Sequence, residues 1–208
     1  MGELSRDACL ADANEIQRAL LQCERRVLHK SGLRYASVLT ALLREGNRWL
    51  VLLTRRDEDL PHHQGQIAFP GGSLDEGESA EQAALREAKE EIGLDPSDVR
   101  ILGCHDDIWT PTGFIITPVI ALLTERPRLT INPAEVARVF YAPLCYFSDE
   151  RHVERRTLIY DGVEREVLFH DYDGEVIWGA TALIISNLLT LLQGGMSEAT
   201  LRRLPDQS

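Results

Sequence analysis

Apolar residues recur with a helical period near the start of the chain and with a strand-like period after it. Between residues 12 and 30 they recur every three or four positions, with Arg and Glu between them, and this spacing predicts an amphipathic helix. The residues that carry the pattern are Ile16, Leu20, Cys23 and Val27. We expect this helix to serve packing and not chemistry.

Runs rich in β-branched and aromatic residues predict strands in the middle of the chain. Residues 36–43 and 49–54 are joined by Arg-Glu-Gly-Asn, which is typical of a turn, so together they predict a hairpin. Further strands are expected at residues 99–104, 114–123, 136–141, 157–160 and 166–170.

Two later segments have helical patterns. The first runs over residues 79–92: Ser79 and Gln82 form a capping box at its start, and Gly93 suits a left-handed C-terminal cap. The second, residues 179–192, has an apolar face broad enough either to be buried or to pair with a second subunit. Because strands and helices alternate irregularly, we expect an α/β fold with a mixed sheet between helices.

Composition narrows the range of functions. The 208 residues include 33 Asp and Glu against 22 Lys and Arg, a net charge of -11, which argues against nucleic acid and anionic membranes as partners. The four cysteines form no CxxC pair, and no apolar run reaches the ~20 residues that span a bilayer. The N-terminus does not resemble a signal peptide, so we expect a soluble protein of the cytoplasm.

Three glutamates are the first candidates for chemistry. At about 100° per residue, Glu87, Glu90 and Glu91 fall within one third of the circumference of the helix over residues 79–92. The helix dipole and mutual repulsion disfavour acids in its last turns, and a divalent cation would reverse that penalty. Oxygen ligands without nearby His or Cys favour Mg²⁺ or Mn²⁺. A solvated acidic surface is the alternative.

The segment from Gly72 to Leu94 resembles the signature of the Nudix hydrolases, G-x5-E-x7-R-E-U-x-E-E-x-G-U, where U is a bulky aliphatic residue. Every fixed letter is present, and only Ala88 is smaller than its U position usually holds. The resemblance implies a Nudix-type α/β/α sandwich with a mixed β-sheet. It also implies hydrolysis of a nucleoside diphosphate linked to another moiety.

The resemblance further implies roles for individual residues. It assigns the metal to Glu87, Glu90, Glu91 and the carbonyl group of Gly71. The expected catalytic residues are Glu90, as the base that activates water, and Arg86, which orients the glutamates. Glu78 is expected to support the junction between loop and helix. Glu135 matches a late acidic position that some members use at the metal; alternatively it opens a strand and pairs with an arginine.

A second motif lies directly upstream and resembles that of the coenzyme A pyrophosphatases, LLTxR[SA]x3Rx3Gx3FPGG. The matching residues are Leu52, Leu53, Thr54, Arg56, Gly65, Phe69, Pro70, Gly71 and Gly72. Asp57 and Pro61 depart from it, and Pro61 stands where the motif has an arginine. The segment IWGATA, residues 177–182, also resembles the C-terminal part of these enzymes.

Candidate substrate contacts follow from this second resemblance. The expected substrate-binding residues are Arg55, Arg56, His63 and Phe69. For Arg55 and His63 the alternatives are an exposed surface arginine and a structural histidine. A partly apolar groove for the substrate would use Trp109, Phe114 and Trp178, for which a place in the core is the alternative. Arg126, Arg128, Arg155 and Arg156 are further candidates for phosphate contact. Asp106 and Asp107 are expected in a solvated loop, with a metal contact as the alternative.

The expected reaction is cleavage of coenzyme A or a derivative to 3',5'-ADP and 4'-phosphopantetheine. Another nucleotide substrate (ADP-ribose, a dinucleotide or an altered nucleoside triphosphate) and a non-catalytic nucleotide-binding module are the alternatives. Isopentenyl diphosphate isomerase shares the fold but is expected to need an active-site cysteine, and none lies between Cys23 and Cys104. We expect an N-terminal extension (1–33), a Nudix domain (34–195), a C-terminal tail (196–208) and a homodimer.

Overall fold

The computed structural model describes residues 12–59, 64–160 and 162–194. Three helices are present in these ranges: α1 (Ala13–Gln22), α2 (Ala80–Ile92) and α3 (Gly179–Leu192). The main sheet consists of β1 (Arg34–Glu45), β2 (Arg48–Arg56), β3 (Ile67–Ala68), β4 (Gly71–Ser73), β5 (Val99–Cys104), β6 (Ile108–Thr110), β7 (Phe114–Leu123) and β8 (Val136–Pro143). A smaller sheet consists of β9 (Glu154–Tyr160), β10 (Val163–Tyr172) and β11 (Glu175–Trp178). Short 3-10 helices lie at Pro96–Asp98, Leu144–Tyr146 and Glu150–His152.

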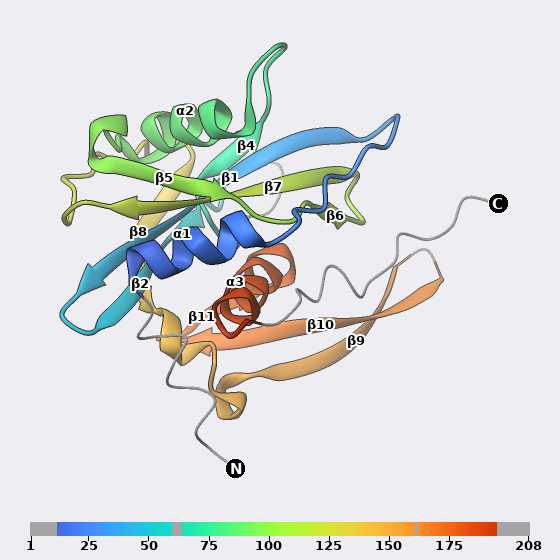
Figure 1. Cartoon of the computed structure of the whole chain (residues 1–208). Helices are drawn as coiled ribbons and strands as arrows, with labels where there is room; N and C mark the ends of the chain where they lie inside the picture. Colours follow the sequence, from blue (N-terminus) through green and yellow to red (C-terminus); the bar gives the residue numbers. More distant parts are fainter. Residues whose placement is uncertain (1–11, 60–63, 161, 195–208) are drawn as a thin grey trace.

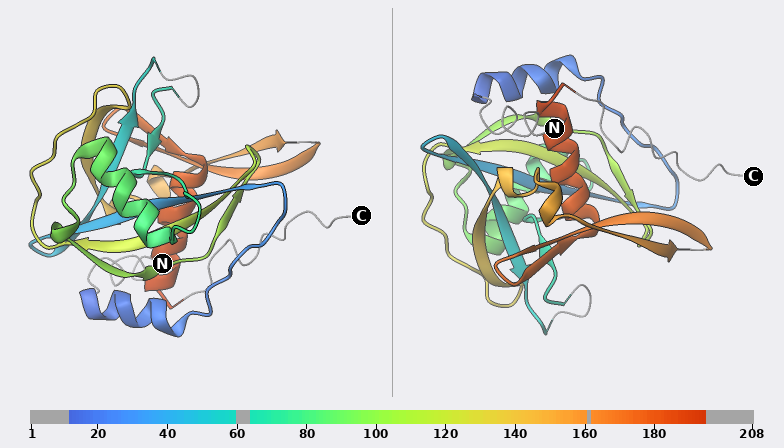
Figure 2. Two further views of the ribbon diagram at one scale, coloured as in Figure 1. Left: turned by 90° about the horizontal axis from the view of Figure 1, so that it is seen from above. Right: turned by 90° about the horizontal axis from the view of Figure 1, so that it is seen from below.

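The main sheet lies between helices, which confirms the expected sandwich. Helix α2 covers one face, and α1 and α3 cover the other, with the smaller sheet beyond α3 (Figures 1 and 2). The pairing of β1 with β7 is parallel whereas β1 with β2 is antiparallel, so the sheet is mixed. The strands predicted at residues 157–160 and 166–170 belong to the smaller sheet and are longer than predicted.

Side chains alternate between the two faces of the main sheet, as the period of a strand requires. In β2, Leu50 and Leu52 belong to the core against α2, while Trp49, Val51 and Leu53 belong to the core against α1 and α3. Helix α3 is buried along Ile184, Ile185, Leu188, Leu189 and Leu191. Its apolar face is therefore used within the chain, and the homodimer stays a prediction.

The predicted N-terminal helix is wrong at its C-terminal end. Helix α1 ends at Gln22, and Val27 is exposed. Backbone amides of the segment after Cys23 donate hydrogen bonds to two carboxylates. Arg26 N donates to Asp106 Oδ1 at 2.9 Å, and Leu28 N donates to Asp107 Oδ2 at 2.9 Å. An extended segment satisfies these acceptors, so the helix stops.

Asp106 and Asp107 are correspondingly not the solvated loop residues that we expected, since both are buried. Asp107 Oδ1 also accepts hydrogen bonds from Arg25 Nη2 at 2.8 Å and Thr117 Oγ1 at 2.7 Å. These carboxylates attach the N-terminal segment to the sheet and are fully used in doing so. None of the helices among the described residues is long and apolar enough to cross a membrane.

We predict that Asp107→Asn lowers the free energy of unfolding by about 3 kcal/mol, because an amide nitrogen cannot accept from the buried Leu28 N–H. Urea unfolding of the purified protein measures this loss. Glu154→Gln, which removes an equal charge from the exposed pair with Arg156, is the control and should leave the unfolding midpoint almost unchanged. Equal midpoints for the two variants would contradict the anchoring role.

Candidate active site

Helix α2 presents its glutamates beside the glycine pair of β4. The helix begins where Ser79 Oγ accepts from Gln82 N and Gln82 Oε1 accepts from Ser79 N, and it ends at Gly93 with φ of +65°. Ala84, Ala88 and Ile92 bury one face against the sheet. Both predicted helix boundaries are confirmed.

The three signature glutamates occupy different environments. Glu91 is 3% exposed, whereas the Glu90 side chain is 57% exposed and Glu87 is half-buried between them. The alternative of a solvated acidic surface is thus wrong for Glu91. Burial raises the pKa of Glu91 to about 8, against the opposing effects of Arg56 and of the hydrogen bond from Gly71 N.

Arg86 holds the remaining carboxylates in place. Its Nε and Nη2 donate to the two oxygens of Glu78 at 2.9 and 3.0 Å, and its Nη1 donates to Glu87 at 2.7 Å and Glu90 at 3.3 Å. Nη2 also donates to the Ser73 carbonyl at 3.0 Å, which joins β4 to the helix. These carboxylates raise the Arg86 pKa, and Arg86 lowers that of Glu78. Glu78 therefore supports the junction, as expected.

The two glycines of β4 leave no room for side chains. A Cβ at Gly71 would overlap the Ser37 carbonyl and the Val38 backbone, and a Cβ at Gly72 would overlap the Glu87 carboxylate. Gly72 has no left-handed φ, so its need for glycine comes from the approach of Glu87 alone. The absence of side chains here lets the sheet edge approach the carboxylates of α2.

We predict that Gly72→Ala displaces Glu87 and lowers kcat roughly 10²-fold while the protein stays folded, because a side chain can move where a backbone cannot. Steady-state rates and thermal unfolding measure the two effects. Glu76→Ala, in the exposed loop before α2, is the control and should keep the wild-type rate. A wild-type rate for Gly72→Ala would show that the position of Glu87 is unimportant.

Glu135 lies close to this cluster. Its carboxylate accepts from Asn132 Nδ2 at 3.0 Å, and its charge contributes to the raised pKa of Glu91. No arginine pairs with it among the described residues, which disfavours the alternative reading of Glu135 as one half of an ion pair.

The metal-binding capacity of the cluster is limited. Within residues 12–59, 64–160 and 162–194, no three His, Cys, Asp or Glu side chains are grouped closely enough to hold a metal ion by themselves. A cation here would need backbone oxygen, substrate oxygen or water in addition to carboxylates. That mixture suits Mg²⁺ and Mn²⁺, which retain water, and does not suit a structural zinc site.

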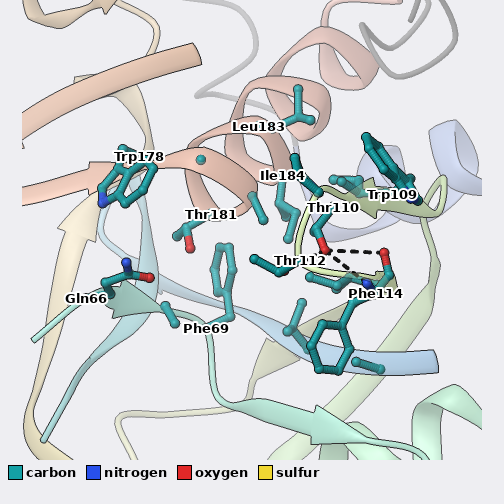
Figure 3. Close-up of a pocket in the computed structure, with 18 of the residues that line it drawn as sticks. Gln66, Phe69, Trp109, Thr110, Thr112, Phe114, Trp178, Thr181, Leu183 and Ile184 are labelled. Carbon is teal, nitrogen blue, oxygen red and sulfur yellow. Dashed lines mark hydrogen bonds between the residues drawn. The ribbon is translucent and has the colours of Figure 1, made fainter. Parts of the chain in front are cut away.

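A cavity of about 470 Å³ extends from this edge across the face of the sheet toward α3. At the carboxylate end it is lined by Arg56, Gly71, Gly72 and Ser73, and Arg56 Nη1 lies 3.8 Å from Glu91 Oε1. Farther in, the cavity has mostly apolar walls. Figure 3 shows Gln66 and Trp178 on one side, Trp109 and Phe114 on the other, and Phe69 between them.

The structure brings some predicted substrate contacts to this cavity and not others. Arg56, Phe69, Trp109, Phe114 and Trp178 line it. The three residues Trp109, Phe114 and Trp178 thus border a cavity, and their contact with substrate stays a prediction. Arg55 does not line it and instead forms an ion pair with Glu58 at 2.6 Å. His63 and Pro61 lie outside the described residues. The roles of Arg55 and His63 stay predictions.

The other candidate arginines lie elsewhere. Arg126 pairs with Glu45, Arg155 with Glu150 and Arg156 with Glu154, and none of them lines the cavity. The sequence patterns instead missed Arg26 and Arg165, which do line it. Neither belongs to a recognisable motif, and the nearest signal was the unexplained acidic pair Asp106 and Asp107, which binds the segment containing Arg26.

Comparison with known proteins agrees with this geometry. The family model described as NUDIX domain matches residues 33–161. The chain is 37% identical over 161 residues to an uncharacterized Nudix hydrolase, NudL, of Photorhabdus laumondii, covering 77% of this chain and 86% of the relative. It is 35% identical over 156 residues to NudL of Escherichia coli K12, covering 74% and 81%. The crystal structure of a Nudix hydrolase from M. smegmatis, RenU, is 28% identical with a TM-score of 0.47, covering 53% of this chain and 71% of that one.

Proposed function

The chain belongs to the Nudix family and is a hydrolase of phosphoric anhydrides, and from this premise we propose that its substrate is coenzyme A or one of its derivatives. The products would be 3',5'-ADP and 4'-phosphopantetheine. The upstream motif from Leu52 to Gly72 supports this choice, as does the segment over residues 177–182.

One observation carries the proposal: both of these segments line one cavity, which extends to the β4 edge beside the carboxylate helix. Arg56, Phe69 and Gly71 from the upstream motif and Trp178 and Thr181 from the later segment line the same space. Thr181 Oγ1 donates to the Ile67 carbonyl at 3.0 Å, which fixes the start of α3 against β3. A cavity with apolar and aromatic walls that opens at one end beside the carboxylates of α2 suits a nucleotide joined to a largely uncharged arm.

Members of the family use divalent metal ions, and we propose Mg²⁺ or Mn²⁺ for this chain. Glu87, Glu90, Glu91 and the Gly71 carbonyl would hold the ion. The buried Glu91 carboxylate and the missing side chains at Gly71 and Gly72 fit that role. When bound, a divalent cation neutralises diphosphate oxygens and lowers the pKa of water.

The chain's own residues would then position the reacting groups. Arg86 keeps Glu87 and Glu90 directed to the same side of the helix. We propose Glu90 as the base that takes a proton from the attacking water, because it is the most exposed of the three glutamates. Arg56 lies between Glu91 and the cavity and would contact a diphosphate oxygen.

A substrate panel tests this proposal. Coenzyme A, ADP-ribose, diadenosine tetraphosphate and nucleoside triphosphates are each incubated with the full chain and Mg²⁺, and kcat/KM is measured for each. We expect the highest value for coenzyme A. A higher value for ADP-ribose, a dinucleotide or a triphosphate would assign the chain to that substrate, and hydrolysis of none would indicate a nucleotide-binding module.

A further inference from the structure

Two arginines line the cavity beside β6, away from the carboxylate helix. Arg26 lies in the segment held by Asp106 and Asp107, the two residues directly before β6: its amide donates to Asp106, and its carbonyl accepts from Asp107 N at 3.0 Å. Arg165 comes from β10, and its guanidinium carbon lies 4.8 Å from the centre of the Trp109 ring. Both side chains line the cavity. Two distant parts of the chain therefore bring cationic groups to one end of it.

Arg26 and Arg165 combine two features: each lines the cavity, and neither forms an ion pair with a carboxylate among the described residues. Most arginines of the described residues form ion pairs, including Arg25 with Asp107 and Arg138 with Glu175. In the part of the chain that the structure describes, neither Arg26 nor Arg165 has such a pair, and the buried Nε of each meets no acceptor. An anionic group of a ligand could accept hydrogen bonds from these two guanidinium groups and neutralise their charge.

The other charged groups near this end leave it positive. The Arg34 guanidinium lies 3.9 Å from the centre of the Phe114 ring, which adds a third cation. Glu166 also lines the cavity and is the one acid among its described lining residues; it lies 3.9 Å from Arg155, which partly offsets its charge. The buried Asp106 and Asp107 also lie at this end, and Asp107 forms an ion pair with Arg25 at 2.8 Å. With Arg25, Arg26, Arg34 and Arg165 against Asp106, Asp107 and the partly compensated Glu166, the excess of positive charge favours an anionic ligand group.

The separation between the two ends follows from the strand order. Ser73 of β4 pairs with Ala36 of β1, Ala36 pairs with Ile116 of β7, and Ile116 pairs with Ile108 of β6. Three steps between neighbouring strands, at about 4.8 Å each, amount to roughly 14 Å. In a nucleoside with phosphates at the 3' and 5' positions, six covalent bonds separate the two phosphorus atoms, which is at most about 7.5 Å. The long arginine side chains would therefore have to reach across the remaining distance toward the diphosphate. Figure 3 shows Phe69 between Trp178 on one side and Trp109 and Phe114 on the other, and the Phe69 ring suits stacking against a base.

We propose that Arg26 and Arg165 bind a phosphomonoester on the nucleoside half of the substrate, and so select nucleotides with a 3'-phosphate over those without it. This inference rests on the proposed function, because coenzyme A carries such a group. Arginine suits the role since its planar fork can donate two hydrogen bonds to one phosphate. The diphosphate lies at the carboxylate end and the 3'-phosphate at the arginine end.

The test compares coenzyme A with 3'-dephospho-coenzyme A in the wild type and in Arg26→Met and Arg165→Met. We expect each variant to lose about 10- to 100-fold in kcat/KM for coenzyme A and less than about twofold for the dephosphorylated substrate. Arg165→Lys keeps the positive charge but loses the planar pair of donors. Its kcat/KM for coenzyme A should lie between those of the wild type and Arg165→Met. Arg48→Met removes an exposed arginine that does not line the cavity, and it should change neither value.

A binding measurement separates this inference from the proposed function. Isothermal titration without hydrolysis compares 3',5'-ADP with 5'-AMP, and the wild type should bind 3',5'-ADP at least tenfold more tightly. Loss of that preference in folded Arg165→Met supports the inference even if coenzyme A is not cleaved. Equal affinities in the wild type, or an undiminished preference in both methionine variants, would overturn it. Thermal unfolding of each variant identifies any that does not fold.

Discussion

Replacing Glu91 by glutamine is expected to abolish most of the activity without weakening the fold. The amide has the shape of the carboxylate but lacks the charge that a metal ion requires, and metal assistance contributes several kcal/mol to the transition state. We therefore expect kcat/KM to fall about 10²- to 10⁴-fold. In metal-free buffer the free energy of unfolding should stay the same or rise. Burial raises the Glu91 pKa to about 8, so near pH 7 the wild type takes up a proton on folding, and the amide needs none.

Rates with Mg²⁺ and urea unfolding in EDTA measure these two effects on one protein. Glu76→Gln is the matched control, since Glu76 is exposed in the loop before α2 and its loss of charge is the same. Activity near the wild-type level in Glu91→Gln would contradict the metal role. A large loss of stability would instead make Glu91 a structural residue.

Replacing Arg86 is expected to have the second largest effect. Arg86→Met removes the donors that hold Glu78, Glu87 and Glu90, so the carboxylates repel one another and separate. We expect kcat to fall about 10²-fold and the metal concentration for half-maximal rate to rise. Arg86→Lys should restore little of the rate, because one ammonium group cannot reach all of these acceptors.

Lys89→Met is the matched control for Arg86, because Lys89 is an exposed cation on the same helix. Metal titrations of the rate compare the variants directly. If Arg86→Lys had the wild-type rate and metal dependence, the fork geometry of Arg86 would have no part in organising the site.

Local signals were sufficient to predict the helix that carries the site. Ser79, Gln82 and Gly93 act through bonds to their near neighbours, so the ends of α2 follow from a few adjacent residues. The strand pattern of β1 and β2 is likewise visible in adjacent residues. In the structure one face of these strands packs on α2 and the other on α3. The positions of the signature glutamates on the helix followed from its period.

Long-range contacts explain what the sequence patterns missed. The periodicity after Gln22 favours a longer helix, but Asp106 and Asp107, about 80 positions away, accept the backbone amides of an extended segment instead. The burial of Glu91 depends on packing of α2 against the sheet, and helical spacing alone contains no such information. Arg26 and Arg165 line one cavity because Arg165 of β10 lies over Trp109 of β6 and the Arg26 segment is bound just before β6, so no local pattern could place them together.

The structure separates acidic and basic groups between the two ends of the cavity. Glu78, Glu87 and Glu90 surround one arginine at the carboxylate end of the cavity, while Arg26 and Arg165 stand at the other end. A ligand with phosphate at both ends would meet a metal-dependent site and a metal-independent one. Removing the metal should therefore abolish hydrolysis while leaving part of the affinity for 3',5'-ADP.

Identification of the products formed from coenzyme A tests the central proposal most directly. The full chain is incubated with coenzyme A and Mg²⁺, and the products are identified by mass spectrometry, with EDTA and with Glu91→Gln as the two controls. We predict equal amounts of 3',5'-ADP and 4'-phosphopantetheine from the wild type and almost none from either control. Intact coenzyme A under conditions in which the same preparation consumes ADP-ribose would contradict it.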